Sequence, residues 1–252
     1  MNRTSHTASK IAEVTLLFWV IKIIATTLGE TTGDFIAQTL NLGYVAGLAI
    51  TGALLVGLVG AQIRAGTYSP TLFWAAIVGT TTAGTEISDL MDRTLQVGYL
   101  GGSLILSAAL AATLLVWYRR EGHLKVNLIA TRRVEVMFWT AVLFSNSLGT
   151  AFGDWMVDGL GLSYAAGAMV CLAIIAAVLA AHYTNTLGEV AVFWIAFVFT
   201  RPFGATFGDL LTKPASHGGL DLGTYNASAV CFVLIAGLVW LNMRRRQWDD
   251  IA

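Results

Sequence analysis

The sequence predicts an all-α membrane protein with eight transmembrane helices, formed by four parallel two-helix repeats that are pseudo-symmetric about the membrane normal. Three observations predict this fold: an apolar composition, apolar runs of membrane-spanning length, and a motif that recurs four times. Hydrophobic residues make up 56% of the 252 residues and charged residues only 12%. Soluble domains typically carry about twice that share of charged residues, so the composition indicates a lipid bilayer as the solvent.

Composition also excludes several classes of function. The formal net charge is zero, which gives no sign of a nucleic-acid partner. Cys171 and Cys231 lie in apolar segments, where we interpret them as core residues rather than a disulfide or a metal pair. The histidines are too scattered for a metal motif; they are His6, His123, His182 and His217. We expect no cofactor and no enzymatic activity, and the oligomeric state cannot be predicted.

A Phe-Trp pair followed by an aspartate defines each repeat. The pairs occupy positions 18–19, 73–74, 138–139 and 193–194. The aspartates that lie 15 residues after each tryptophan are Asp34, Asp89, Asp154 and Asp209. Small residues stand five and one positions before each aspartate: Gly29 and Gly33, Gly84 and Ser88, Gly149 and Gly153, and Gly204 and Gly208. Such fixed spacing over four copies indicates an internal repeat.

Each repeat contains two apolar runs. The expected spans are 11–38, 43–63, 70–94, 98–118, 133–158, 162–182, 187–212 and 222–243. We predict helices because the runs are continuous, whereas membrane-barrel strands alternate between apolar and polar residues. The first run shares the repeat motif, so we treat it as a retained span rather than a signal peptide. An even number of spans places both termini on one side.

The repeat spacing divides the chain into two halves. Successive tryptophans of the Phe-Trp pairs lie 55, 65 and 55 residues apart. The longer middle step contains a basic linker, so we expect a first half at 1–128 and a second half at 129–252. Every copy starts on the same side of the membrane, which makes the repeats parallel with an axis along the membrane normal.

The recurring Phe-Trp pairs and downstream Gly-Asp residues resemble a bacterial membrane-protein family known only as a repeat of unknown function, number 347. The resemblance covers essentially the whole chain, and the second repeat departs from it where Ser88 replaces the glycine before Asp89. The resemblance implies a protein with eight spans in a bacterial membrane. It implies no activity.

Basic residues predict the orientation. One side of the predicted membrane holds Arg3, Lys10, Arg64, Arg119, Arg120, Lys125, Arg132, Arg133, Arg244, Arg245 and Arg246. The opposite side holds only Arg93 and Lys213. Basic loops remain in the cytoplasm, so we expect both termini to be cytoplasmic in a bacterial inner membrane. The tryptophans of the Phe-Trp pairs are interpreted as anchors at the cytoplasmic interface.

The recurring aspartates, together with Glu30 and Glu86, are the candidate ion-binding or proton-relay residues. Small residues four apart let helices approach closely, so we expect the repeat glycines to serve packing. Packing does not explain an acid within a span, which costs roughly 2.5–3.5 kcal/mol on insertion scales. Glu30 and Glu86 precede Asp34 and Asp89 by four and three residues and therefore share their helix faces. The alternative is that each aspartate is a solvated helix end or a structural hydrogen-bonding group.

A cluster of such acids requires a bound cation, protons or basic partners. Lys22 and Arg201 are the candidate counter-ions or gates, and Arg201 occupies the repeat position that holds Thr26, Thr81 and Asn146 in the other copies. The alternative for Lys22 is that it extends to the cytoplasmic interface. Nearby serines and threonines either line a polar pathway or bond back to their own helices.

These features favour a transporter or permeation pathway for a cation, either a divalent metal such as Mn²⁺ or Mg²⁺ or a proton-coupled substrate, with a central cluster of intramembrane carboxylates. Carboxylates without Cys or His suit Mg²⁺, Mn²⁺, Ca²⁺, Na⁺ or protons, and a substrate that carries an amine would satisfy the same groups. The metal ligands would be Asp34, Asp89, Asp154 and Asp209. The alternatives are a scaffold or sensor without transport, and an intramembrane aspartyl hydrolase. The hydrolase motif Gly-x-Gly-Asp lacks its first glycine in all four copies.

Overall fold

The computed structural model describes residues 9–184 and 186–249, and these form an all-helical bundle without strands. The long helices are α1 (Leu16–Asp34), α2 (Gly43–Arg64), α3 (Pro70–Asp89), α4 (Tyr99–Glu121), α5 (Arg132–Asp154), α6 (Tyr164–Tyr183), α7 (Glu189–Thr212) and α8 (Thr224–Asp249). The first three repeats continue past their aspartate in π-helical turns, η1 (Phe35–Thr39), η2 (Leu90–Thr94) and η4 (Trp155–Gly159). Short 3-10 turns, η3 (Val126–Leu128) and η5 (Ala215–His217), lie in the connections. The predicted all-α class and the helix order are confirmed.

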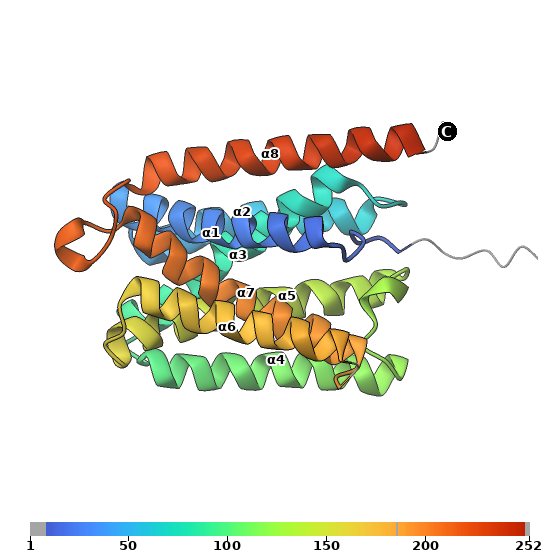
Figure 1. The fold of residues 1–252 in the computed structure, drawn as a ribbon, viewed down its shortest axis with the longest axis horizontal. Helices are drawn as coiled ribbons and strands as arrows, with labels where there is room; N and C mark the ends of the chain where they lie inside the picture. Colours follow the sequence, from blue (N-terminus) through green and yellow to red (C-terminus); the bar gives the residue numbers. More distant parts are fainter. Residues whose placement is uncertain (1–8, 185, 250–252) are drawn as a thin grey trace, which may run out of the picture.

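The first helices of the repeats form an inner ring. In this ring α1 packs on α3, α3 on α5, α5 on α7, and α7 again on α1 (Figure 1). The second helices lie outside the ring, and each packs chiefly on the inner helix of the next repeat: α2 on α3, α4 on α5, α6 on α7 and α8 on α1. The same contact therefore recurs four times around one axis, as the parallel repeats predict.

All inner helices run in the same direction. Their first residues lie at the end of the bundle where α8 finishes, and their aspartates lie at the opposite end (Figure 1). We call these the terminal end and the aspartate end. The division into residues 1–128 and 129–252 remains a prediction, since the contact of α4 with α5 and that of α8 with α1 both join one half to the other.

The start of α1 differs from the expected span that begins at residue 11. Thr15 has an extended backbone, and its side chain accepts a hydrogen bond from the Phe18 amide, so the helix begins at Leu16. The preceding segment lies across the terminal end of the bundle, with Ile11 buried. Lys10 is buried as well, where its ammonium contacts Glu135 Oε2 at 2.5 Å. Lys10 is therefore an internal ion-pair partner and not an interfacial charge.

The repeat glycines lie where neighbouring inner helices meet. A Cβ atom added at Gly84 would lie 3.0 Å from the Ser147 backbone nitrogen of α5, and one added at Gly149 would lie 2.5 Å from the Arg201 Cβ of α7. The remaining contacts follow the same order around the ring: Gly29 faces Thr81, Gly33 faces Thr85, Gly153 faces Ala205, Gly204 faces Thr26, and Gly208 faces Glu30. Small residues thus permit the close approach of all four inner helices.

The Phe-Trp pairs fill the terminal end of the inner ring. Their phenylalanines are buried, and the Phe18 ring lies 6.4 Å from that of Phe73 and 6.4 Å from that of Phe193. Trp74 and Trp139 are buried beside them, with exposed fractions of 2% and 4%. The prediction that these tryptophans anchor the lipid interface is wrong for the buried ones, because they pack against the aromatic rings of neighbouring repeats.

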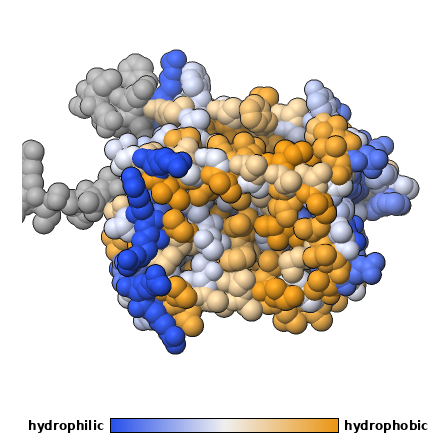
Figure 2. Space-filling view, turned by 180° about the vertical axis from the view of Figure 1, so that it is seen from behind, coloured by the Kyte–Doolittle hydropathy of each residue, from blue (hydrophilic) through white to orange (hydrophobic). Residues whose placement is uncertain are grey.

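Seven helices of the described chain are long and apolar enough to cross a membrane, which is typical of a multi-pass membrane protein; they are α1, α2 and α4–α8. The eighth, α3, has 20 residues but carries many polar groups, and most of its side chains are buried by other helices. Figure 2 shows an apolar band across the middle of the molecule between two hydrophilic ends. The exposed apolar residues lie largely on the outer helices, including Leu54, Leu104, Met169 and Phe232.

Basic side chains are distributed unequally between the two ends. Arg64, Arg119, Arg120, Lys125, Arg132 and Arg133 belong to the connections and helix ends at the terminal end. Within the described ranges, the aspartate end carries Arg93 and Lys213, and both form salt bridges. Arg3 and the side chains of Arg245 and Arg246 lie outside the described part of the structure.

We expect Gly149→Ala to destabilise the bundle by about 1–3 kcal/mol, because an added methyl group overpacks a close helix contact. The new Cβ would collide with Arg201 Cβ and Cγ, both 2.5 Å away. Gly57→Ala is the matched control, since a Cβ at Gly57 in α2 meets no atom of the described residues within 4 Å. Thermal unfolding in detergent, followed by tryptophan fluorescence, measures both variants. Equal stability of the two variants would contradict the packing role of Gly149.

Candidate cation site

The inner helices arrange their polar residues in layers along the bundle axis. Residues four apart lie on one face of a helix, so each aspartate shares its face with the residues four and eight positions earlier and four positions later. On α1 this face carries Thr26, Glu30 and Asp34, and Gln38 follows in η1. The corresponding positions of α3, α5 and α7 lie at similar depths, because the helices are parallel and related by the repeat.

The aspartates form two pairs, each joined by one base. Lys213 Nζ lies 2.6 Å from Asp34 Oδ2 and 3.2 Å from Asp209 Oδ1. Arg93 lies 3.1 Å from Asp89 Oδ1 and, through Nη2, 3.6 Å from Asp154 Oδ2. Each base thus joins two aspartates, so the four carboxylates that the sequence predicted as ligands are held as two ion-paired groups.

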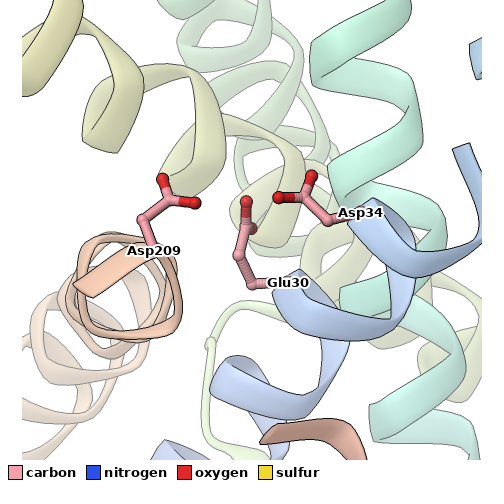
Figure 3. A group of neighbouring side chains, drawn as sticks. All are labelled: Glu30, Asp34 and Asp209. Carbon is pink, nitrogen blue, oxygen red and sulfur yellow. The ribbon is translucent and has the colours of Figure 1, made fainter. Parts of the chain in front are cut away.

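Glu30 makes the two pairs different. Its carboxylate joins those of Asp34 and Asp209, with one oxygen of each residue within 4.8 Å of those of the other two. Figure 3 shows the three side chains converging, Glu30 and Asp34 from α1 and Asp209 from α7. All three are buried, with exposed fractions of 4%, 3% and 8%. The second pair has no acid at the equivalent position, where α3 and α5 carry Thr85 and Thr150.

Carboxylate oxygens at this spacing can hold a hard cation. Mg²⁺, Mn²⁺ and Ca²⁺ bind several oxygen ligands at about 2.0–2.6 Å, so oxygens of Glu30, Asp34 and Asp209 could reach one ion between them. The Lys213 ammonium contacts two of these groups, Asp34 and Asp209. Asp89 and Asp154, which we expected to be ligands as well, lie with Arg93 and the partly exposed Asp158. The structure does not bring them into the three-carboxylate group.

Arg201 lies beneath this group, inside the bundle. Its side chain has an exposed fraction of 0%, and its Nη2 donates to Glu30 Oε2 at 2.8 Å and to Thr85 Oγ1 at 2.5 Å. Gly149 of α5 provides the space for the stem of this side chain. Arg201 is thus a counter-ion of Glu30, and it links α7 to α1 and α3.

Lys22 and Asn146 form the next polar layer toward the terminal end. Lys22 is fully buried. Its ammonium donates to Asn146 Oδ1 at 3.2 Å and lies 4.2 Å from the centre of the Phe197 ring. Asn146 donates in turn to Thr80 Oγ1 at 3.0 Å. The alternative that Lys22 extends to the lipid interface is therefore wrong, because the side chain points into the bundle.

Threonines bond back to their own helices, and several of them also contact neighbouring helices. Thr26 Oγ1 donates to Ile23 O at 2.8 Å and contacts Thr200 O of α7 at 3.1 Å. Thr81 makes the equivalent bonds one repeat later, to its own helix and to Ala25 O of α1 at 3.1 Å. The hydroxyl groups of Thr26 and Thr81 therefore stabilise the ring by bonding across its helix contacts.

A pocket of about 350 Å³ reaches the candidate site from the aspartate end. It is lined by Asp34, Gln38, Thr39, Thr212, Lys213, Gly223, Thr224, Tyr225 and Asn226. Two of these residues, Asp34 and Lys213, also belong to the ion-pair group. The pocket therefore connects the surface at this end with one of the three carboxylates.

Arg93 and Lys213 are the site residues that the sequence reasoning missed. Each stands four positions after its aspartate, a spacing that favours ion pairing along a helix, so the signal was present. Burial opposes the charge on Lys213, but the Asp209 and Asp34 carboxylates outweigh it and raise the pKa of Lys213 above its usual value. Lys213 therefore remains protonated at neutral pH, as the two salt bridges require.

We expect Arg201→Met to destabilise the protein by about 3–5 kcal/mol, since removing one partner of a buried ion pair leaves the other charge without compensation. The double variant Arg201→Met with Glu30→Gln should recover most of the loss, because the carboxylate that Arg201 neutralises is then absent. Thermal unfolding in detergent compares the variants. A double variant less stable than Arg201→Met alone would show that Glu30 does not depend on Arg201.

Comparison with known proteins identifies the repeat. The model described as Repeat of Unknown Function (DUF347) matches residues 17–68, 72–123, 137–189 and 192–247. No curated protein and no solved structure matches the chain. The matched segments contain the inner and outer helix of each repeat. The chain therefore belongs to the DUF347 repeat family, whose four copies form the bundle and supply the residues of the candidate site.

Proposed function

We propose that the protein carries a small cation across a membrane and that Glu30, Asp34 and Asp209 bind the cation on its way. The convergence of three buried carboxylates from α1 and α7 is the observation that carries the proposal. Ionisable groups among membrane helices are costly and commonly mark ion pathways. A solvated helix end does not account for these acids, because all three residues are buried.

The ligand chemistry favours a hard cation. All three groups supply oxygen, the donor type that suits Mn²⁺, Mg²⁺ and Ca²⁺. Lys213 occupies the position of a competing cation, because its ammonium contacts Asp34 and Asp209. A cation that enters from the pocket would displace this ammonium. Lys213 has a side-chain exposure of 22%, which leaves room for it to move toward the surface.

The two ends of the bundle support a pathway with alternating access. The pocket gives access from the aspartate end, whereas Phe18, Phe73 and the other buried aromatic side chains fill the terminal end. Transport would require these aromatic groups to separate. Since basic residues concentrate at the terminal end, we propose that this end faces the cytoplasm and that the membrane is the bacterial inner membrane.

A scaffold or sensor role is the second candidate, and the ion pairing favours it. Arg93, Arg201 and Lys213 form ion pairs that offset much of the buried negative charge. Such a network could hold helices together without moving an ion. In that case replacement of the aspartates by asparagine would leave the behaviour of the protein largely unchanged.

We expect Asp34→Asn and Asp209→Asn to reduce cation flux to the level of empty vesicles, because each change removes a ligand charge. Proteoliposomes would be tested with Mn²⁺, Mg²⁺, Ca²⁺, Na⁺ and an organic cation, with internal pH recorded. Asp89→Asn and Asp154→Asn are the matched controls, since these aspartates hold the same position in their repeats but lie outside the three-carboxylate group. These variants should retain flux. Absence of flux for every cation in well-inserted wild type would refute the proposal.

Lys213→Gln should tighten cation binding on the order of tenfold, because a positive charge that competes for the same carboxylates is removed. The loss of the free Mn²⁺ signal in electron paramagnetic resonance measures binding. Arg93→Gln is the control, since Arg93 joins the aspartate pair that lacks a third carboxylate. If both variants change Mn²⁺ affinity equally, general electrostatics and not a site at Lys213 would explain the result.

A further inference from the structure

We propose that Glu86 is a proton-binding site between α2 and α3, distinct from the Glu30–Asp34–Asp209 site. Sequence spacing grouped Glu86 with Asp89, but the structure directs its carboxylate to Gly47 of α2. An added Cβ at Gly47 would lie 2.6 Å from Glu86 Oε2 and 2.8 Å from Cδ. The glycine thus lets the backbone of α2 lie directly against the carboxylate.

Glu86 differs from the other buried acids of the described residues in having neither a hydrogen-bond donor nor a salt bridge. Its exposed fraction is 0%, and neither oxygen accepts a hydrogen bond from any residue in the described ranges. By contrast, Glu30 accepts from Arg201, and Asp34 accepts from Lys213 and Gln38. A carboxylate that is buried, ionised and unpaired is strongly unfavourable, and it becomes neutral by binding a proton.

Neighbouring acids favour a bound cation at Glu86, and the lack of further ligands favours a proton over a metal. The acids whose charges act on it are Asp89 of its own helix and Asp34 and Glu30 of α1, and no base of the described residues acts with them. The facing helix α2 contributes the uncharged Gly47. A metal ion would need several ligands, and Glu86 does not belong to the three-carboxylate group that could supply them.

The acid at this position is specific to the second repeat. The equivalent residues three positions before the aspartate are Thr31, Ala151 and Thr206. Thr206 faces Gly167 of α6, which corresponds to Gly47 facing Glu86. The repeated contact between inner and outer helix therefore exists without an acid, so packing alone does not require Glu86.

Loss of this proton would place a charge against α2 and draw in water or a cation. If the proposed cation transport is correct, Glu86 is a candidate carrier of the coupled proton; this step rests on the proposed function. Proton binding itself does not, because it follows from burial and the absent donor. The experiment below therefore tests Glu86 without measuring transport.

Carbodiimide labelling of the full chain in lipid vesicles tests the proposal. Dicyclohexylcarbodiimide takes the proton of a neutral carboxyl group, the carboxylate oxygen adds to its central carbon, and an acyl shift to nitrogen leaves a stable adduct of the whole reagent. Mass spectrometry should find labelling of Glu86 on the order of tenfold above that of the ion-paired Glu30 and Asp34. Labelling should fall as the pH rises, because only the protonated form reacts.

Variants and a second measurement keep the result decisive. Glu86→Gln should lose the adduct, whereas Asp158→Asn, at a partly exposed acid outside both sites, should keep it. Gly47→Ala should reduce labelling because its Cβ displaces the carboxylate, and Gly167→Ala is the matched control without an acid opposite. Infrared spectra should show a protonated-carboxyl band at neutral pH that Glu86→Gln removes. If that band is unchanged in Glu86→Gln, the proposal is overturned. If the adduct forms but no cation flux is measured, proton binding by Glu86 is supported and the proposed cation transport is refuted.

Discussion

The close approach of the inner helices is the constraint on which the rest of the structure depends. Glycine or serine stands at each contact of the ring, so the backbones of neighbouring repeats nearly touch. Each of these glycines contacts the next inner helix of the ring. The residue that it contacts there stands eight positions before the aspartate of that next helix. These pairs are Gly29 with Thr81, Gly84 with Asn146, Gly149 with Arg201, and Gly204 with Thr26. The cyclic order of these contacts fixes the register of the four helices and the depth of every polar layer.

Close packing excludes water from these layers, and burial makes charge compensation necessary. Arg201 neutralises Glu30 within the bundle, while Lys213 and Arg93 each hold two aspartates at the aspartate end. Lys22 lacks a carboxylate partner among the described residues, and its ammonium contacts Asn146 and the Phe197 ring instead. Glu86 stands apart from this pattern, since no donor of the described residues reaches it.

The four repeats share one geometry but carry different residues at equivalent positions. These differences place the site at the contact between α1 and α7. Four residues after the aspartates, the repeats carry Gln38, Arg93, Asp158 and Lys213. Four residues before them, the repeats carry Glu30, Thr85, Thr150 and Ala205. Only α1 contributes two acids to its inner face, and it meets α7 where the fourth repeat closes onto the first. The common repeat thus forms a symmetric bundle. Residue differences between the repeats make the contact between α1 and α7 chemically distinct.

The sequence by itself determined the helical class, the four parallel repeats, the packing residues and the aspartates, because each depends on composition or on spacing along the chain. Tertiary structure decided which acids meet. Asp34 and Asp209 are 175 residues apart, and their pairing through Lys213 depends on ring closure between α7 and α1. It also decided the directions of Lys22 and Glu86, since residues on one helix can face the axis or a neighbouring helix. Local spacing defines a helix face, but only the packing of the other helices defines what that face contacts.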